Sequence, residues 1–417
     1  MGNSDREFEV KSLIVFILAM VANVMGVIFQ SLAGHLLHDA TLFADLNAVI
    51  ALFNILVLPT MVTSCLITKY TAEFAAKDEY GKIKKFLNEV AKVLIIGAVL
   101  FILVLMLFRD LISKWLHMGD SNIIITAIVL AGISLFSSIF VGGLQGMQAF
   151  VLYGIFGMIG PFFKIVAVLF ATIMEGKIVT ILVIWLLGTI ISYFIGIVFL
   201  KKKLDKYDKR KTNISTKALW SYLISLFVTN VGLLLFSNID TLLVKHYFDT
   251  EAGYYTAALM LGKIITYFTG SFVVVMFPMV SAEEKTESEK FAILKKSIIY
   301  NIGIGIIIVV MINLLGDISI TLLLGREFAE CKKFLFPLSV YVLPLSILNL
   351  IANYAMANKK TKIMSLSLVL GSIAEVIGVG MLQESIFLFV WFIAFMAWGL
   401  VFINYMHMYE NSKKAEE

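Results

Sequence analysis

The chain has 417 residues, of which 60% are hydrophobic and 15% are charged, with a net charge of +5 and a mean hydropathy of +0.94. A typical soluble domain is about 45–50% apolar and about 25% charged, so this composition excludes a single water-soluble domain. Because apolar runs of about 20 residues, each long enough to cross a bilayer, recur along the chain, we predict an all-α polytopic membrane protein.

Twelve segments are predicted to span the membrane, joined by short loops that leave no room for an inserted soluble domain. In chain order the spans are 11–33, 43–69, 89–108, 123–148, 151–174, 178–200, 218–244, 254–280, 297–315, 335–357, 362–382 and 386–408. The first is interpreted as a retained helix, because its apolar run exceeds the roughly 7–15 residues of a signal-peptide core.

The densest basic loop, KKKLDKYDKRKTNISTK, begins at Lys201, almost at the midpoint of the chain. A shift of the sequence by half its length gives a faint self-match, in which GLQGMQAF (Gly143–Phe150) falls on ANYAMANK (Ala352–Lys359). We therefore predict two pseudo-symmetric lobes of six helices, an N-lobe over 1–207 and a C-lobe over 208–417. Because six spans return the chain to the same side, the lobes are predicted to be parallel repeats.

Most of the 34 Lys and Arg residues fall in loops on one side of the predicted membrane. The positive-inside rule then places both termini in the cytoplasm of a multi-pass protein of the cell membrane. The net positive charge is accordingly attributed to topology and to anionic membrane lipids, and no nucleic-acid partner is expected.

Three ionisable residues lie deep within predicted spans: Lys164, Lys263 and Glu375. Lys164 is about 20 Å from the inner end of its span and about 15 Å from the outer end, too far for its side chain to reach the interface. A lipid-facing lysine at the centre costs about 2.5–3.5 kcal/mol. Either the lysines pair with a buried carboxylate such as Glu375, or they line a wet cavity between the lobes and bind an anion. We favour the cavity, with all three as candidate substrate-binding residues.

Two carboxylates, Asp45 and Asp240, lie near the outer ends of predicted helices. Each either anchors a neighbouring helix or couples transport to a cation, because a buried Asp can titrate with conformation. One turn before Lys164 come Gly160 and Pro161. Proline frees a backbone carbonyl and can kink a span, so this pair is a candidate hinge, with a static kink in a packing face as the alternative.

No catalytic arrangement is evident in the sequence. It has no glycine-rich phosphate loop and no nucleophile elbow, and the longest outer loop, 316–334, is too short for an active-site domain. The five histidines have no zinc-ligand spacing, so we predict no metal and no cofactor. These features count against an enzyme, including a membrane polymerase or ligase of glycan assembly.

Short motifs in the second half resemble a known family. They are SNIDTLLVKHYFDTEAGYYTAALMLGKI (Ser237–Ile264), FPMVSAEE (Phe277–Glu284), LLLGREF (Leu322–Phe328) and ANYAMANKK (Ala352–Lys360). Their order and placement, together with twelve spans, resemble the polysaccharide transporter family of O-antigen and exopolysaccharide flippases, within the MATE-like MOP exporter superfamily.

The resemblance implies an alternating-access transporter that moves a polyprenyl-diphosphate-linked oligosaccharide from the inner to the outer leaflet for surface polysaccharide biosynthesis. It implies a cationic cavity into which Lys164 and Lys263 would fit, a coupling cation (H⁺ or Na⁺), and glycan-assembly proteins as partners. A cation-coupled multidrug or metabolite exporter of the same superfamily remains the alternative.

Overall fold

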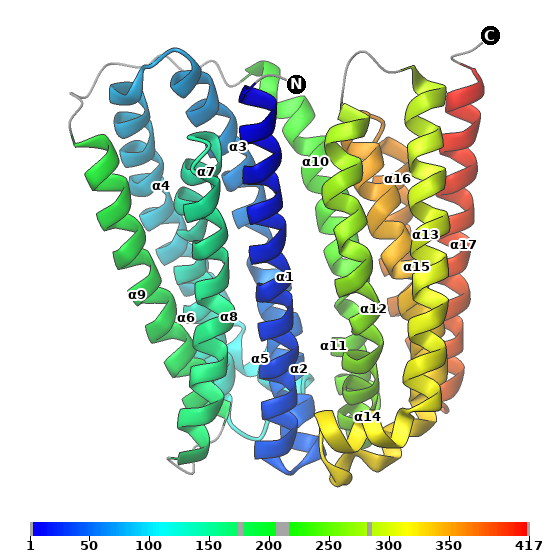
Figure 1. Ribbon diagram of the computed structural model, residues 1–417. Helices are drawn as coiled ribbons and strands as arrows, with labels where there is room; N and C mark the ends of the chain where they lie inside the picture. Colours follow the sequence, from blue (N-terminus) through cyan, green and yellow to red (C-terminus); the bar gives the residue numbers. More distant parts are fainter. Residues whose placement is uncertain (1–2, 174–177, 206–216, 282–285, 415–417) are drawn as a thin grey trace. The chain divides into compact units, whose positions relative to one another are not determined.

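The computed structural model describes residues 3–173, 178–205, 217–281 and 286–414, and every regular element in these ranges is a helix (Figure 1). The predicted all-α class is therefore confirmed. Each of the twelve predicted spans coincides with one helix or with two consecutive helices. Among the described residues, ten helices are long and apolar enough to cross a membrane, and one bent pair makes an eleventh. The remaining predicted span, 254–280, lies within α12 (Asp249–Ser281), whose 33 residues extend about 50 Å.

The chain forms two compact units, one made of Met1–Leu32 and Leu52–Leu223 and the other of Ala33–Ala51 and Ile224–Glu417. The end of α1 (Asn3–Leu37) and most of α2 (Ala40–Leu56) thus pack with the second unit. The lobe boundary at residues 207 and 208 remains a prediction.

The first unit is built from α1 and the helices that follow α2. These are α3 (Leu58–Ala76), α4 (Tyr80–Leu107), α5 (Arg109–Trp115), α6 (Ser121–Ser134), α7 (Ser137–Gly146), α8 (Phe150–Ile173) and α9 (Ile178–Leu204). Helices α3 and α7 pack closely, because a Cβ atom on Gly142 or Gly146 would lie 2.6 Å from a backbone oxygen of α3. Glycines one turn apart allow this approach.

The second unit contains the end of α1, most of α2 and the helices that follow α9, except that the first residues of α10, up to Leu223, belong to the first unit. The helices after α9 are α10 (Lys217–Phe236), α11 (Ile239–Tyr247), α12, α13 (Glu287–Leu314), α14 (Gly316–Leu323), the 3₁₀ helix η1 (Arg326–Cys331), α15 (Lys332–Ala357), α16 (Lys362–Met381) and α17 (Ile386–Lys413). Helix α15 is buried along most of its length and forms the centre of this unit. A capping box between Thr286 and Glu289 fixes the start of α13.

Helix α4 carries an apolar stripe on its outer face. Val93, Ile96, Leu100 and Leu103 follow helical spacing, and each side chain is more than half exposed. An apolar surface of this kind is unfavourable in water and favourable against lipid tails. Together with the long apolar helices, it shows a multi-pass membrane protein.

Candidate functional site: buried charges in two helical units

In the first unit, Lys164 lies between aromatic rings. It is on α8, about 21 Å along the helix from Phe150 and about 14 Å from Ile173. Its Nζ is 4.0 Å from the ring centroid of Trp185 on α9 and 5.7 Å from that of Phe29 on α1. Both rings are almost fully buried. Trp185 offers a cation–π interaction worth about 0.5–2 kcal/mol, which offsets part of the cost of a charge at this depth.

No carboxylate forms an ion pair with Lys164 in the described part of the first unit. An aromatic face stabilises the ammonium group without neutralising it. Within the described first unit, Lys164 thus has aromatic contacts and no carboxylate partner, and both the favoured cavity role and the alternative, an ion pair with Glu375, stay predictions.

The candidate hinge lies in α8, which continues as a helix through Pro161. Three glycines precede Pro161 on α8, and the first of them, Gly154, packs against Leu18. A Cβ atom added to Gly154 would lie 2.4 Å from the Leu18 side chain. At Gly157 and Gly160 an added Cβ would meet nothing within 4 Å. The close packing is thus confined to Gly154, and a hinge at Gly160 and Pro161 remains a prediction.

In the second unit, four fully buried side chains from four helices form a cluster, which we call the carboxylate–tyrosine cluster. Its members are Asp240 on α11, Tyr255 on α12, Tyr341 on α15 and Glu375 on α16. The Tyr255 hydroxyl donates a hydrogen bond to Oδ2 of Asp240 at 2.7 Å. The Tyr341 hydroxyl lies 3.2 Å from the carbonyl oxygen of Phe236 and 3.4 Å from Oε1 of Glu375.

The two carboxylates of the cluster act on one another electrostatically, and Lys263 on α12 acts on Asp240. With all three groups ionised, the local charge is −1. Among the described residues, Oε2 of Glu375 has no hydrogen-bond partner. A buried carboxylate is stable only when it is neutralised by a proton or a cation, so the cluster is suited to hold one of them.

Asp45 lies apart from these residues in an ion pair of its own. Its Oδ1 is 2.6 Å from Nζ of Lys245, a side chain only 1% exposed, and Lys245 also pairs with Asp249. The pair joins α2 to α11 within the second unit. This geometry suits an anchor between helices, which is the role that we propose for Asp45.

Three partners of the predicted residues were not found from the sequence: Tyr255, Tyr341 and Lys245. The spacing of four residues between Lys245 and Asp249 is typical of a helical ion pair, and this spacing is a signal in the sequence that could have identified the lysine. The tyrosines carry no local signal, because their acceptors come from other helices. Among the described residues, no group of three or more His, Cys, Asp or Glu side chains could hold a metal ion.

The fold and these sites define the class of the protein. It is a polytopic helical membrane protein that holds charges inside its helical units. Residues 10–284 match the sequence profile of a family described as polysaccharide biosynthesis protein. Because this match covers more than half of the chain, the protein belongs to that family, and the resemblance noted in its sequence is confirmed. A comparison with curated proteins found no match.

Solved structures share the fold over nearly the whole chain. An inward-facing multidrug resistance MATE family transporter of the MOP superfamily superposes with a TM-score of 0.73 at 12% identity, covering 97% of this chain and 99% of that one. A MOP superfamily transporter from Pyrococcus furiosus has a TM-score of 0.67 at 14% identity, covering 98% and 96%. The lipid II flippase MurJ in an inward closed conformation has a TM-score of 0.69 at 15% identity, covering 96% and 87%. The MATE-like fold is therefore confirmed.

Proposed function

We propose that this protein is a flippase that moves a polyprenyl-diphosphate-linked oligosaccharide from the inner to the outer leaflet by alternating access. The match of residues 10–284 to the polysaccharide biosynthesis family carries the proposal. A fold shared with a lipid II flippase supports it. Surface polysaccharide biosynthesis is the process that such a step would serve.

Lys164 and Lys263 are the proposed contacts for the diphosphate or for acidic sugars. Lys164 has an aromatic partner and, within the described first unit, no ion pair, so its charge remains available. Lys263 has a carboxylate near it and is the weaker candidate. Glu375, first assigned to substrate binding, is fully buried beside Tyr341, which favours a role in coupling instead.

The carboxylate–tyrosine cluster is the proposed coupling site for H⁺ or Na⁺. Its two carboxylates and one lysine leave a single uncompensated negative charge, which one monovalent cation would balance. Binding and release of that cation would change the electrostatics of α11 and α16 together, because Asp240 and Glu375 belong to these two helices. Gly160 and Pro161 on α8 are the proposed hinge for the accompanying motion.

Neutralising the coupling site is expected to remove the ion dependence of transport. In Asp240→Asn and Glu375→Gln, substrate movement in proteoliposomes should become at least tenfold less sensitive to an imposed Na⁺ or pH gradient. Glu384→Gln, which changes an exposed carboxylate at the loop before α17, is the matched control. Wild-type ion dependence in both cluster variants would contradict the assignment.

The structural neighbours keep one rival open, a cation-coupled exporter of drugs or metabolites, because two of them are MATE or MOP transporters. A membrane enzyme of glycan assembly is the less favoured rival, since the family and the fold are those of transporters. We propose that the protein catalyses no covalent step. We also place it in the cell membrane with both termini in the cytoplasm, where glycan-assembly proteins would supply its substrate.

The decisive experiment is a lipid extract of a strain lacking this protein, with polyprenyl-diphosphate glycans measured by mass spectrometry. Accumulation of one lipid-linked oligosaccharide, together with loss of the matching surface polymer, is the expected result. It would also identify the glycan. An unchanged lipid pool with intact surface polymer, in a strain without a second flippase, would overturn the proposal and favour the exporter.

A further inference from the structure

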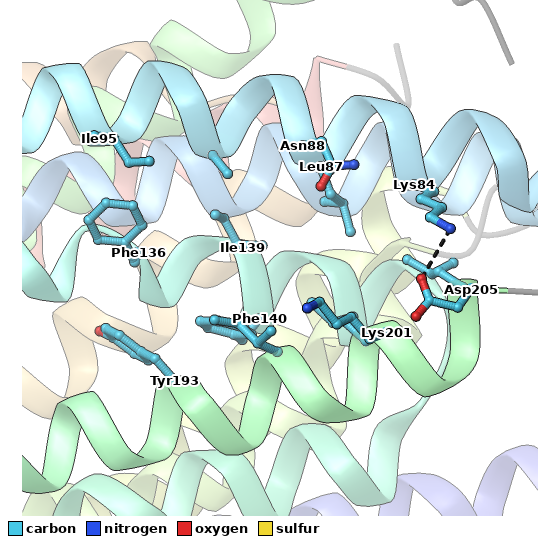
Figure 2. A pocket seen from close by; sticks show the side chains of 14 residues that line it. Lys84, Leu87, Asn88, Ile95, Phe136, Ile139, Phe140, Tyr193, Lys201 and Asp205 are labelled. Atoms are coloured by element: carbon cyan, nitrogen blue, oxygen red, sulfur yellow. Dashed lines mark ion pairs between the residues drawn. The ribbon is translucent and has the colours of Figure 1, made fainter. Parts of the chain in front are cut away.

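The first unit carries a groove of about 560 Å³ between α4, α7 and α9 (Figure 2). None of the buried charged residues described above belongs to it. Most of its wall is apolar, from side chains that include Leu87, Ile95, Ile139, Phe140, Ile197 and Leu200. The ring of Phe140 stacks on that of Tyr193 at 5.2 Å, and this pair gives the groove a rigid aromatic wall.

The polar residues gather at one end of the groove. Figure 2 shows Lys84 and Asp205 together at that end and Lys201 between them and Phe140, whereas Ile95, Phe136 and Tyr193 lie at the other end. Nζ of Lys84 is 3.0 Å from Oδ1 of Asp205. The Tyr193 hydroxyl is turned away to the backbone oxygen of Ser134, at 3.3 Å, so the far end stays apolar.

The groove is open toward the lipid. Ile95 on α4 and Ile197 on α9 line it, and their side chains are 53% and 44% exposed. On α4 the exposed apolar stripe runs directly beside Ile95. A lipid chain can therefore enter from the bilayer sideways, without passing through the interior of the unit.

The length of the groove matches one leaflet. Lys84 and Ile95 are eleven residues apart on α4, which is about 16 Å along the helix axis. Half of a hydrocarbon core of about 30 Å is about 15 Å. An ordinary acyl chain whose headgroup lies at Lys84 would thus end near Ile95, whereas a polyprenyl chain would extend far beyond the groove.

The charge at the polar end matches a phosphodiester. Among the described residues that line this end, Lys84 and Lys201 contribute two positive charges and Asp205 one negative charge, which leaves +1. A phospholipid such as phosphatidylglycerol carries one negative charge on its phosphodiester, whereas a polyprenyl diphosphate carries more than one. The groove is therefore complementary to a singly charged anionic phospholipid in both length and charge.

We propose that this groove binds one anionic phospholipid, with an acyl chain against Phe140 and Ile95 and the phosphate at Lys84 and Lys201. The inference does not depend on the transported substrate. The bound lipid would fill the space between α4 and α9 and join two helices whose facing residues leave a gap.

Native mass spectrometry of the full-length protein, released from detergent with added lipid, tests the proposal. The probes are phosphatidylglycerol and phosphatidylcholine with identical chains. Because one lysine near a membrane surface contributes about 1 kcal/mol toward an anionic lipid, wild type should prefer phosphatidylglycerol about fivefold. Lys201→Ala should remove this preference, and Asp205→Asn should increase it about fivefold. Lys202→Ala, an exposed neighbour outside the groove, should leave it unchanged.

A second pair of variants tests the position of the chain. Ala91→Trp places a large side chain in the groove and should lower retention of both lipids at least tenfold. Val93→Trp, on the exposed face of α4, is the matched control and should retain them. Equal lipid preference in wild type and Lys201→Ala would overturn the proposal. So would stronger binding of a polyprenyl diphosphate in competition, because it would assign the groove to the transported substrate.

Discussion

Lys164→Ala is expected to lower export at least 30-fold while leaving the amount of protein in the membrane near normal. The ammonium group lies about 14 Å or more from either end of α8, so no surface charge can replace it. Removing a buried cation from an ionic contact costs about 2–5 kcal/mol. At about 1.4 kcal/mol for each factor of ten, the lower end of this range gives roughly 30-fold. Surface polymer normalised to protein abundance is the measurement.

Two variants separate a binding role from a structural one. Lys164→Arg keeps the charge and can still stack on Trp185, so it should retain much of the activity. Lys92→Ala removes an exposed lysine of α4 and should have no effect. If Lys164→Ala instead lowers abundance, and exchange of Lys164 with Glu375 restores it, the lysine is a structural ion-pair partner and the binding role is wrong.

Lys245→Met is expected to destabilise the protein by about 3–5 kcal/mol, the largest stability effect that we anticipate. The substitution leaves Asp45, whose side chain is 9% exposed, without its cation. An uncompensated buried charge has a cost of this size. The free energy of unfolding, measured by denaturant titration in mild detergent, reports the effect.

Removing both charges of the pair provides the internal test. Lys245→Met combined with Asp45→Asn should recover most of the loss, because the orphaned carboxylate is then gone. Lys332→Met is the matched control, since its ion pair with Asp317 is largely exposed and should contribute less than about 1 kcal/mol. If Lys245→Met and Lys332→Met lower the free energy of unfolding equally, burial of the Asp45–Lys245 pair does not affect stability.

The sequence predicted the helices well because the signal for a membrane span is local. Apolar stretches such as 89–108 and 386–408 are continuous along the chain, and both coincide with observed helices, α4 and α17. Breaks between two helices within one predicted span were harder to predict from the sequence. The span predicted at 43–69 is a pair of helices, α2 and α3, bent by 40° ahead of Pro59, where the proline fixes the start of α3.

The residues around each buried charge could not be predicted in the same way. The depth of Lys164 in its span can be predicted from the sequence. Its contact with Trp185 cannot, because that contact depends on how the faces of α8 and α9 pack together. Tyr341 belongs to the helix at the centre of the second unit, and its hydroxyl reaches Glu375 on another helix. Hydropathy reports how deep a side chain lies and carries no information on which neighbour it faces.

The sequence by itself thus determined the membrane class, the helical segments and the charged residues too deep to reach water, because these depend on composition and spacing along one chain. The tertiary structure alone decided which charges are paired. Asp45 and Lys245 are far apart in sequence and form an ion pair, whereas Lys164 has an aromatic ring as its partner. It also decided that exposed residues of α4 and α9 enclose a groove with a basic end. Such contacts arise only when helices distant in the chain pack together, which fixes the surroundings and therefore the chemistry of each charge.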